Sequence, residues 1–256
     1  MSHAIGNTLS VTRLEWRRLI VRPLAWVLGA LTLAWLAWNF TLLLGSFLAA
    51  QIQRAALPDG PGFTDLVAVP LLGQLAQLAF LVVPLLSMSV LAGERRDGTL
   101  PLLFAAGLSA PQIVLGKYLA VLGWLLLWLA LTLAMPLALA HATHLDWGKL
   151  AAATLGLLLM LAALAALGVA CSTFASHPAI AAAAALVLTL ALWSVNFGAQ
   201  MAGVTGGAVN WLAMSTHEQP LLRGLVSTSD VLWFVLLIAL ALALATRRLS
   251  SDRERG

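Results

Sequence analysis

Charge is scarce in this sequence. Of its 256 residues, 9% are Asp, Glu, Lys or Arg, whereas 61% are hydrophobic. A soluble protein carries about 25% charged residues, and its interior at this length is too small to bury so much apolar surface. The composition therefore excludes a soluble enzyme or binding domain. It predicts an integral membrane protein surrounded mostly by lipid.

Cysteine and nucleotide-binding motifs are scarce too. The single cysteine, Cys171, excludes an intramolecular disulfide and a cysteine-based metal cluster, and its apolar neighbours predict a packed thiol. The one Gly-Lys pair, Gly116-Lys117, is followed by Tyr118, and Pro111 stands where a phosphate-binding loop has its first glycine. The sequence also contains no recognisable Ser-His-Asp set or paired carboxylates. We therefore predict no enzymatic activity and no cofactor bound by this chain.

Ionisable residues are missing from the interiors of the apolar runs. Carriers driven by ion gradients and channels with charged filters need such groups at depth, so both classes are disfavoured. The polar exceptions are four amides, which are the candidates for a translocation surface: Asn39, Gln74, Gln77 and Asn196.

Long apolar runs predict six membrane-spanning helices, because about 20 apolar residues cross a bilayer. No segment alternates apolar and polar residues with period two, which excludes a membrane β-barrel. Small residues in the fourth and fifth runs predict close helix packing. The fold class is an all-α membrane protein of one domain, 1–256, with an external loop or re-entrant segment at 199–228. The predicted helices are 23–48, 67–92, 117–140, 150–174, 178–198 and 229–247.

Basic residues are distributed unevenly between the two sides of this arrangement. Three lie on one side: Arg54, Lys149 and Arg223. Eleven lie on the other: Arg13, Arg17, Arg18, Arg22, Arg95, Arg96, Lys117, Arg247, Arg248, Arg253 and Arg255. The positive-inside rule places both termini in the cytoplasm, and we expect a bacterial inner membrane. The net charge of +4 then reflects topology, and no nucleic-acid partner is expected.

The N-terminal segment, 1–22, predicts an amphipathic helix in the cytoplasmic interface. Its apolar face over residues 5–20 comprises Ile5, Leu9, Trp16, Leu19 and Ile20. Glu15, Arg17 and Arg18 lie off that face, from which the arginines can reach lipid phosphates. A basic flank that only orients the first span is the alternative.

The loop 93–117 carries the densest charge, in the run Glu94-Arg95-Arg96-Asp97. Thr99 is placed to cap a short helix, and Pro101 suits its first turn. Gly107 would end this helix, and Ser109 would start the next. The pattern predicts an element that a cytoplasmic partner could contact, or else a plain charged turn. The apolar side of the short helix would be Leu100, Leu102, Leu103 and Phe104.

This loop, "GERRDGTLPLLFAAGLSAPQIVLGKYLA", resembles the signature of ABC-2-type permeases, roughly G-E-[RK]-x-x-G-T-[LI] followed later by G-K. The matching positions include Gly93, Glu94, Arg95, Gly98, Thr99, Leu100, Ile113, Gly116 and Lys117. "TRLEWRRLIVRPLAW" is similar to the N-terminal helix of that family. "THEQPLLRGLVSTSDVLWF", with His217, Gly224 and Asp230, resembles the last segment of gliding-motility and copper-enzyme-maturation permeases.

The resemblance implies a six-helix subunit that pairs with a second permease copy or paralogue. It also implies a cytoplasmic ABC ATPase, with ATP and Mg on that partner, and export or force transmission toward a possible periplasmic partner. Gly98, Thr99 and their neighbours would be the coupling residues. The full set is Glu94, Arg95, Arg96, Asp97, Gly98, Thr99, Leu100, Leu102, Leu103 and Phe104.

Two other functions stay open at this stage. His141 and His144 are three residues apart with Asp146 close by, a spacing that could place two imidazoles on one helix face for a metal. These residues, with His217, would suit a metal-handling or enzymatic membrane protein. A non-transporting scaffold that signals across the membrane is the second alternative.

Overall fold

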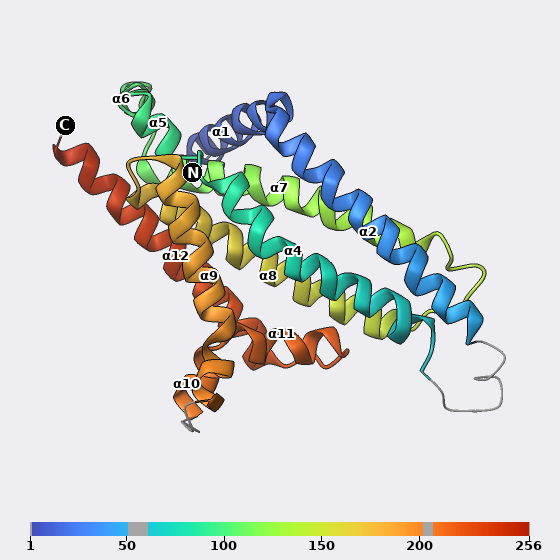
Figure 1. The fold of residues 1–256 in the computed structure, drawn as a ribbon. Coiled ribbons are helices and arrows are strands. Elements are labelled where there is room, and N and C mark those ends of the chain that lie inside the picture. Colours follow the sequence, from blue (N-terminus) through green and yellow to red (C-terminus); the bar gives the residue numbers. More distant parts are fainter. Residues whose placement is uncertain (1, 51–60, 202–206, 256) are drawn as a thin grey trace.

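The computed structural model describes residues 2–50, 61–201 and 207–255, and the described chain is helical, with turns between the helices. Within these described residues, six helices are long and apolar enough to cross a membrane, so the six predicted spans are confirmed and the chain is a multi-pass membrane protein. Figure 1 shows them as a tilted bundle. The spans are built from α2 (Pro23–Ala49), η1 (Thr64–Ala68) with α4 (Val69–Ser87), α7 (Ala110–Leu137), α8 (Trp147–Phe174), α9 (Pro178–Met201) and α12 (Thr228–Arg255). The other helices are α1 (Ser2–Val21), α5 (Ala92–Arg96), α6 (Leu100–Ala105), α10 (Gly207–Leu212) and α11 (Met214–Leu222).

Several boundaries differ from the predicted ones. The third span begins at Ala110 instead of 117, because Ser109 and Gln112 form a capping box in which the Ser109 N–H donates to Gln112 Oε1 at 2.9 Å. The second span runs from Thr64 to Arg96 and is interrupted, because α4 ends at Ser87 and four residues separate it from α5. The last continues to Arg255 instead of ending at 247.

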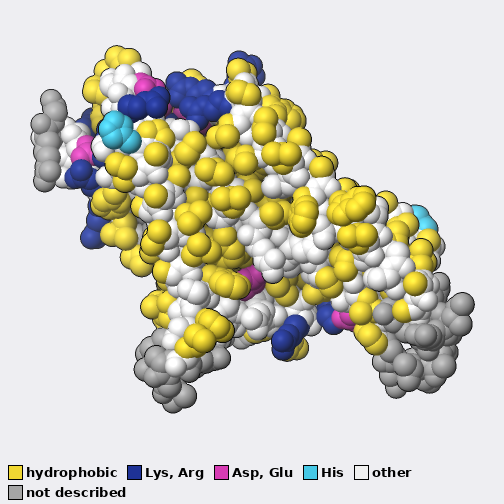
Figure 2. Space-filling view, viewed as in Figure 1, with side chains coloured by type: hydrophobic (Ala, Val, Ile, Leu, Met, Phe, Trp, Pro, Cys, Tyr) yellow, Lys and Arg dark blue, Asp and Glu magenta, His cyan; other side chains and the backbone are white. Residues whose placement is uncertain are grey.

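Apolar and basic side chains occupy different parts of the surface. In Figure 2 hydrophobic side chains cover the flanks of the bundle, while dark-blue basic side chains gather at the end that carries α5, α6 and the C-terminus. This end is called the basic end below. Lys149 and Arg223 belong to the opposite end, and Arg54 lies outside the described residues. The asymmetry agrees with the positive-inside argument, and cytoplasmic termini stay a prediction.

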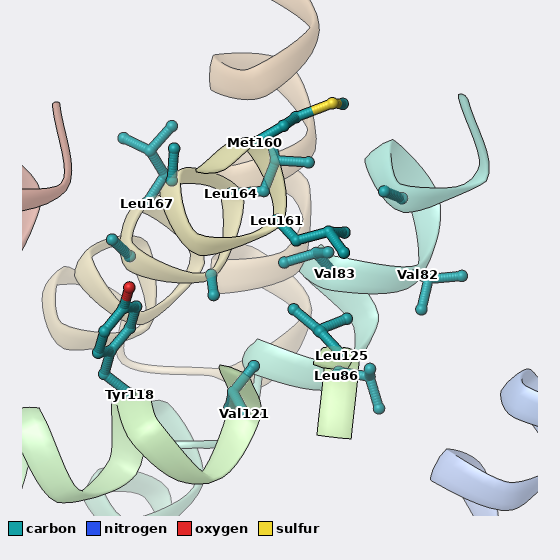
Figure 3. Close-up of a cluster of buried hydrophobic side chains, with 14 of the residues drawn as sticks. Val82, Val83, Leu86, Tyr118, Val121, Leu125, Met160, Leu161, Leu164 and Leu167 are labelled. Carbon is teal, nitrogen blue, oxygen red and sulfur yellow. The ribbon is translucent and has the colours of Figure 1, made fainter. Parts of the chain in front are cut away.

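Helix α8 forms the centre of the bundle. In its most apolar stretch 78% of the residues are buried, against 17% in α2 and in α9. Its side chains meet those of α4 and α7 in the cluster of Figure 3. Glycines of α8 allow close packing on two sides: a Cβ added to Gly168 would clash with Ser87 of α4, and one added to Gly156 would lie 2.7 Å from Leu221 of α11.

The segment predicted to be external contains two short helices, α10 and α11. Helix α11 packs against α8 and α9. Gly224, whose φ is +91°, follows it and lies against Lys149. Such a φ favours glycine, so the chain turns there before α12 begins.

Candidate functional site

The segment 93–117 comprises most of α5, the short helix α6 and the start of α7, joined by tight turns. Helix α5 ends at Arg96, Gly98 turns the chain with a φ of +68°, and α6 follows. Gly107, with a φ of +77°, lies just beyond α6 as predicted. Thr99 occupies the N-cap position, but its hydroxyl donates to the Glu94 carbonyl at 3.4 Å and does not cap α6. The predicted side-chain cap at Thr99 is therefore wrong.

Four charged side chains meet at the base of this loop, and we call them the ionic cluster: Glu15, Arg18, Glu94 and Lys117. Lys117 Nζ lies 2.8 Å from Glu15 Oε1 and 2.9 Å from Glu94 Oε1. Arg18 Nη1 lies 2.9 Å and 3.0 Å from the same two oxygens. Lys117 is 1% exposed, and both glutamates are buried. Two cations and two carboxylates therefore neutralise one another while joining α1, α5 and α7.

The cluster changes the interpretation of the N-terminal helix. Leu9 and Ile20 on its predicted lipid face are exposed, as expected for an interfacial helix. A second face, with Val11, Glu15 and Leu19, is buried. Glu15 lies off the lipid face as predicted, but the prediction that Leu19 lies on that face is wrong, because Leu19 belongs to the second face, which packs on α7.

Glycines of α7 make that contact close. A Cβ on Gly116 would lie 2.7 Å from Val11 and 3.0 Å from the Thr8 carbonyl oxygen, and one on Gly123 would lie 2.7 Å from Trp16. The Gly116-Lys117 pair thus has a physical role. Gly116 has no side chain, so α1 can approach α7 closely, and Lys117 binds Glu15 of α1.

Helix α8 holds the junction between α4 and α5. Ser172 Oγ accepts the backbone N–H groups of Leu91 and Ala92, each at 3.0 Å, and donates to the Met88 carbonyl at 3.0 Å. One buried hydroxyl therefore satisfies three backbone groups where the second span is interrupted.

The C-terminal end of α12 supports the same loop. Arg95 of α5 forms an ion pair with Asp252, which also lies 3.4 Å from Arg248. The Arg253 guanidinium lies 5.8 Å from the centroid of the Phe104 ring in α6. The loop is thus anchored by α1, α7, α8 and α12.

The tip of the loop is exposed. Leu100 and Glu94 point into the protein, whereas Leu102 is 68% exposed. Arg96 and Asp97 pair with each other at 2.9 Å on the surface. The exposed tip comprises Arg96, Asp97, Gly98, Thr99, Pro101, Leu102, Ala105, Ala106 and Gly107.

The sequence matches the family model described as ABC-2 family transporter protein over residues 59–216. The chain belongs to the ABC-2 transporter family. The matched segment contains the loop 93–117, Lys117 and Ser172, and it leaves out α1 and α12. A comparison with curated proteins found no match. The permease is therefore assigned to a family of transporter membrane components.

The four amides proposed for a translocation surface come from three helices. Asn39 donates to Trp35 of its own helix at 2.9 Å, Gln77 is exposed, and Gln74 is half-buried. No hydrogen bond of the described residues joins the four. Asn196 lines a pocket with polar groups, of about 470 Å³, together with Trp193, Ser194, Phe197, Ser215 and Gln219.

The predicted metal site at His141, His144 and Asp146 required a helix that the structure does not have at these residues. Helix α7 ends at Leu137, so His141 and His144 lie in the following turn and are exposed. Asp146 caps α8, accepting the Lys149 N–H at 3.0 Å. Among the described residues no group of three His, Cys, Asp or Glu side chains could hold a metal ion.

Sequence reasoning missed Glu15, Arg18 and Ser172 as site residues. The signal for Glu15 was its place one helical turn from Val11 and Leu19, which forms a second apolar stripe around a carboxylate. Ser172 carried no signal of its own, because its partners are backbone groups 80 or more residues away.

Proposed function

We propose that this permease couples ATP hydrolysis by a separate cytoplasmic ATPase to export or to force transmission across the membrane. The ATPase, with its ATP and Mg, would dock on the exposed tip of α5 and α6. The observation that carries the proposal is the difference in burial between the tip and the base of the loop 93–117. Its tip exposes Leu102, while its base is anchored by the buried ionic cluster.

The coupling residues predicted from the sequence then divide into two roles. Leu102 and the surface around Gly98 would contact the ATPase. Glu94, which is buried and bonded to Lys117 and Arg18, would transmit displacement of the tip to α7 and α1. An apolar side chain exposed at a cytoplasmic tip suits the cleft of a protein partner.

A second permease copy or paralogue would complete the transporter in a bacterial inner membrane. Helices α2 and α9 are the least buried spans, so their apolar surfaces face lipid or that partner. Within the family, the resemblance of the last segment favours the gliding-motility and copper-enzyme-maturation group.

Copurification of the ATPase from mild detergent tests the docking surface. Leu102→Asp should abolish copurification, since a charge would enter the apolar contact. Leu225→Asp is the matched control, because Leu225 is 66% exposed at the opposite end. Equal ATPase recovery with both variants would overturn the assignment of the tip.

Sealed vesicles separate transport from signalling alone. ATP-dependent movement of a substrate that Leu102→Asp abolishes would support export. ATPase stimulation without movement of any substrate would favour force transmission or the non-transporting scaffold.

A further inference from the structure

His217 lies between three helices at the end opposite the basic end. Its ring belongs to α11 and is 5% exposed. Nδ1 lies 2.7 Å from Asp230 Oδ1 in the first turn of α12. Nε2 lies 2.9 Å from the backbone carbonyl oxygen of Trp211 in α10. The imidazole therefore connects α10, α11 and α12.

Both neighbours of this ring are hydrogen-bond acceptors when Asp230 is ionised. A neutral imidazole has one N–H and one bare lone pair. It could satisfy the carboxylate or the carbonyl, but its second nitrogen would then face an oxygen lone pair at under 3 Å. Both contacts are satisfied only when the His217–Asp230 pair holds two protons.

The surroundings favour imidazolium with carboxylate over a neutral ring with a carboxylic acid. Trp233 of α12 stacks on the imidazole, with ring centroids 4.8 Å apart and an interplanar angle of 22°. An indole face attracts a cation above it. Asp230 supplies the opposite charge at hydrogen-bond distance, and a charge-assisted bond of this kind is stronger than a neutral one.

Few other charges act on the ring from the described helices around α11. Helices α4, α9 and α10 contribute no ionisable side chain. Helix α8 contributes Lys149, which pairs with Asp65 of η1, and Cys171. Besides Asp230, the charged residues of α12 lie in its last turns. Helix α11 adds the buried Glu218, and Arg223 follows it.

We propose that His217 and Asp230 form a proton-binding site that fixes α11 against the bundle, and that loss of the second proton releases α11 from α8 and α9. Deprotonation turns one of the two hydrogen bonds into a contact between lone pairs and removes the cation from the Trp233 face. The contact of Leu221 with Gly156 then lacks its anchor at the other side of α11. The site is independent of ATPase docking, since it lies at the opposite end of the bundle.

Ring protonation is the first measurement. The permease, labelled with ¹⁵N-histidine and reconstituted in nanodiscs, should show a ring with both nitrogens protonated under the conditions in which α11 is protected from exchange. That signal should vanish in His217→Gln and change to a neutral ring as the pH is raised. A neutral His217 ring at every pH at which α11 is protected from exchange would overturn the proposal.

The second measurement is hydrogen exchange of the α11 amides, corrected for the intrinsic base catalysis of exchange. Parent protein should lose roughly tenfold protection on deprotonation. In Asp230→Asn the side-chain amide donates to Nδ1 of a neutral ring, while Nε2–H still donates to the Trp211 carbonyl. When Asp230→Asn is combined with Glu218→Gln, which removes the Glu218 titration, protection should therefore persist without pH dependence, whereas His217→Gln should be unprotected throughout. The same pH response in Asp230→Asn/Glu218→Gln and in Glu218→Gln alone would contradict the mechanism.

Glu218 requires a separate control because it is buried beside His217 in the sequence. In Glu218→Gln the pH-dependent change of the His217 ring and the accompanying loss of α11 protection should both remain. Their disappearance would assign the pH response to Glu218 and overturn the role of the His217–Asp230 pair.

Discussion

The ammonium group of Lys117 lies 2.8 Å from the Glu15 carboxylate, although 102 positions separate the two residues in the sequence. The bond joins the start of the third span to the N-terminal helix, at the point where Glu94 brings in the loop 93–117. Charge concentrated in that loop thus has two uses. Some of it faces solvent at the tip, and some of it fixes the base.

Lys117→Met should destabilise the fold by about 3–5 kcal/mol, the cost of leaving buried charge without its partner. Glu15 and Glu94 would then share only Arg18, whose side chain is 46% exposed. Chemical unfolding in detergent measures the loss. The double variant Lys117→Met/Glu94→Gln should recover part of it, since one cation and one carboxylate would remain balanced.

Arg96→Ala is the control for this comparison. Its ion pair with Asp97 is exposed, and such pairs contribute about 0–1 kcal/mol. If Lys117→Met lowered the free energy of unfolding no more than Arg96→Ala, the ionic cluster would not stabilise the loop.

Gly116→Ala should displace α1 without changing any charge. The added methyl group would lie 2.7 Å from Val11 and 3.0 Å from a backbone oxygen, and overpacking of this kind costs about 1–3 kcal/mol. Trypsin should then cleave after Arg13 and Arg17 faster than in the parent. Gly45→Ala serves as the matched substitution, because nothing lies within 4 Å of its new Cβ. Equal cleavage of both variants would refute the close contact.

The spans could be predicted from the sequence because lipid imposes one strong requirement, a long apolar helix. The loop 93–117 was also predictable, since Gly98, Pro101 and Gly107 limit the local backbone. The ionic cluster was not, because Glu15 and Lys117 meet only after α1 folds onto α7. The same holds for His217 and Asp230, whose pairing depends on the turn at Gly224. Local pattern predicts elements, while contacts between distant elements depend on packing.

Ser172→Ala should loosen the junction between α4 and α5. It would leave the N–H groups of Leu91 and Ala92 without their shared acceptor, at about 1–3 kcal/mol for each buried group. Hydrogen exchange of residues 88–96 should increase. Thr173→Val is the control, because the Thr173 hydroxyl donates only to Val169 of its own helix at 2.9 Å. Unchanged hydrogen exchange of residues 88–96 in Ser172→Ala would show that Ser172 does not stabilise the junction.

Glu218 should make the stability of the α11 region depend on pH. Burial raises the pKa of its carboxyl from 4.5 to about 7. The packed state therefore retains a proton that an exposed Glu218 gives up near pH 4.5. Stability is highest below that pH, falls as the pH rises from 4.5 to about 7, and stays low above it.

Glu218→Gln removes this titration while keeping the size of the side chain. At pH 8 the variant should exceed the parent by up to about 3 kcal/mol, and at pH 4.5 the two should be nearly equal. Thermal unfolding in detergent across this range measures the difference, with Glu254→Gln as the control because Glu254 is exposed at the basic end. Parallel pH profiles for the parent and Glu218→Gln would mean that the Glu218 carboxyl already reaches water in the packed state.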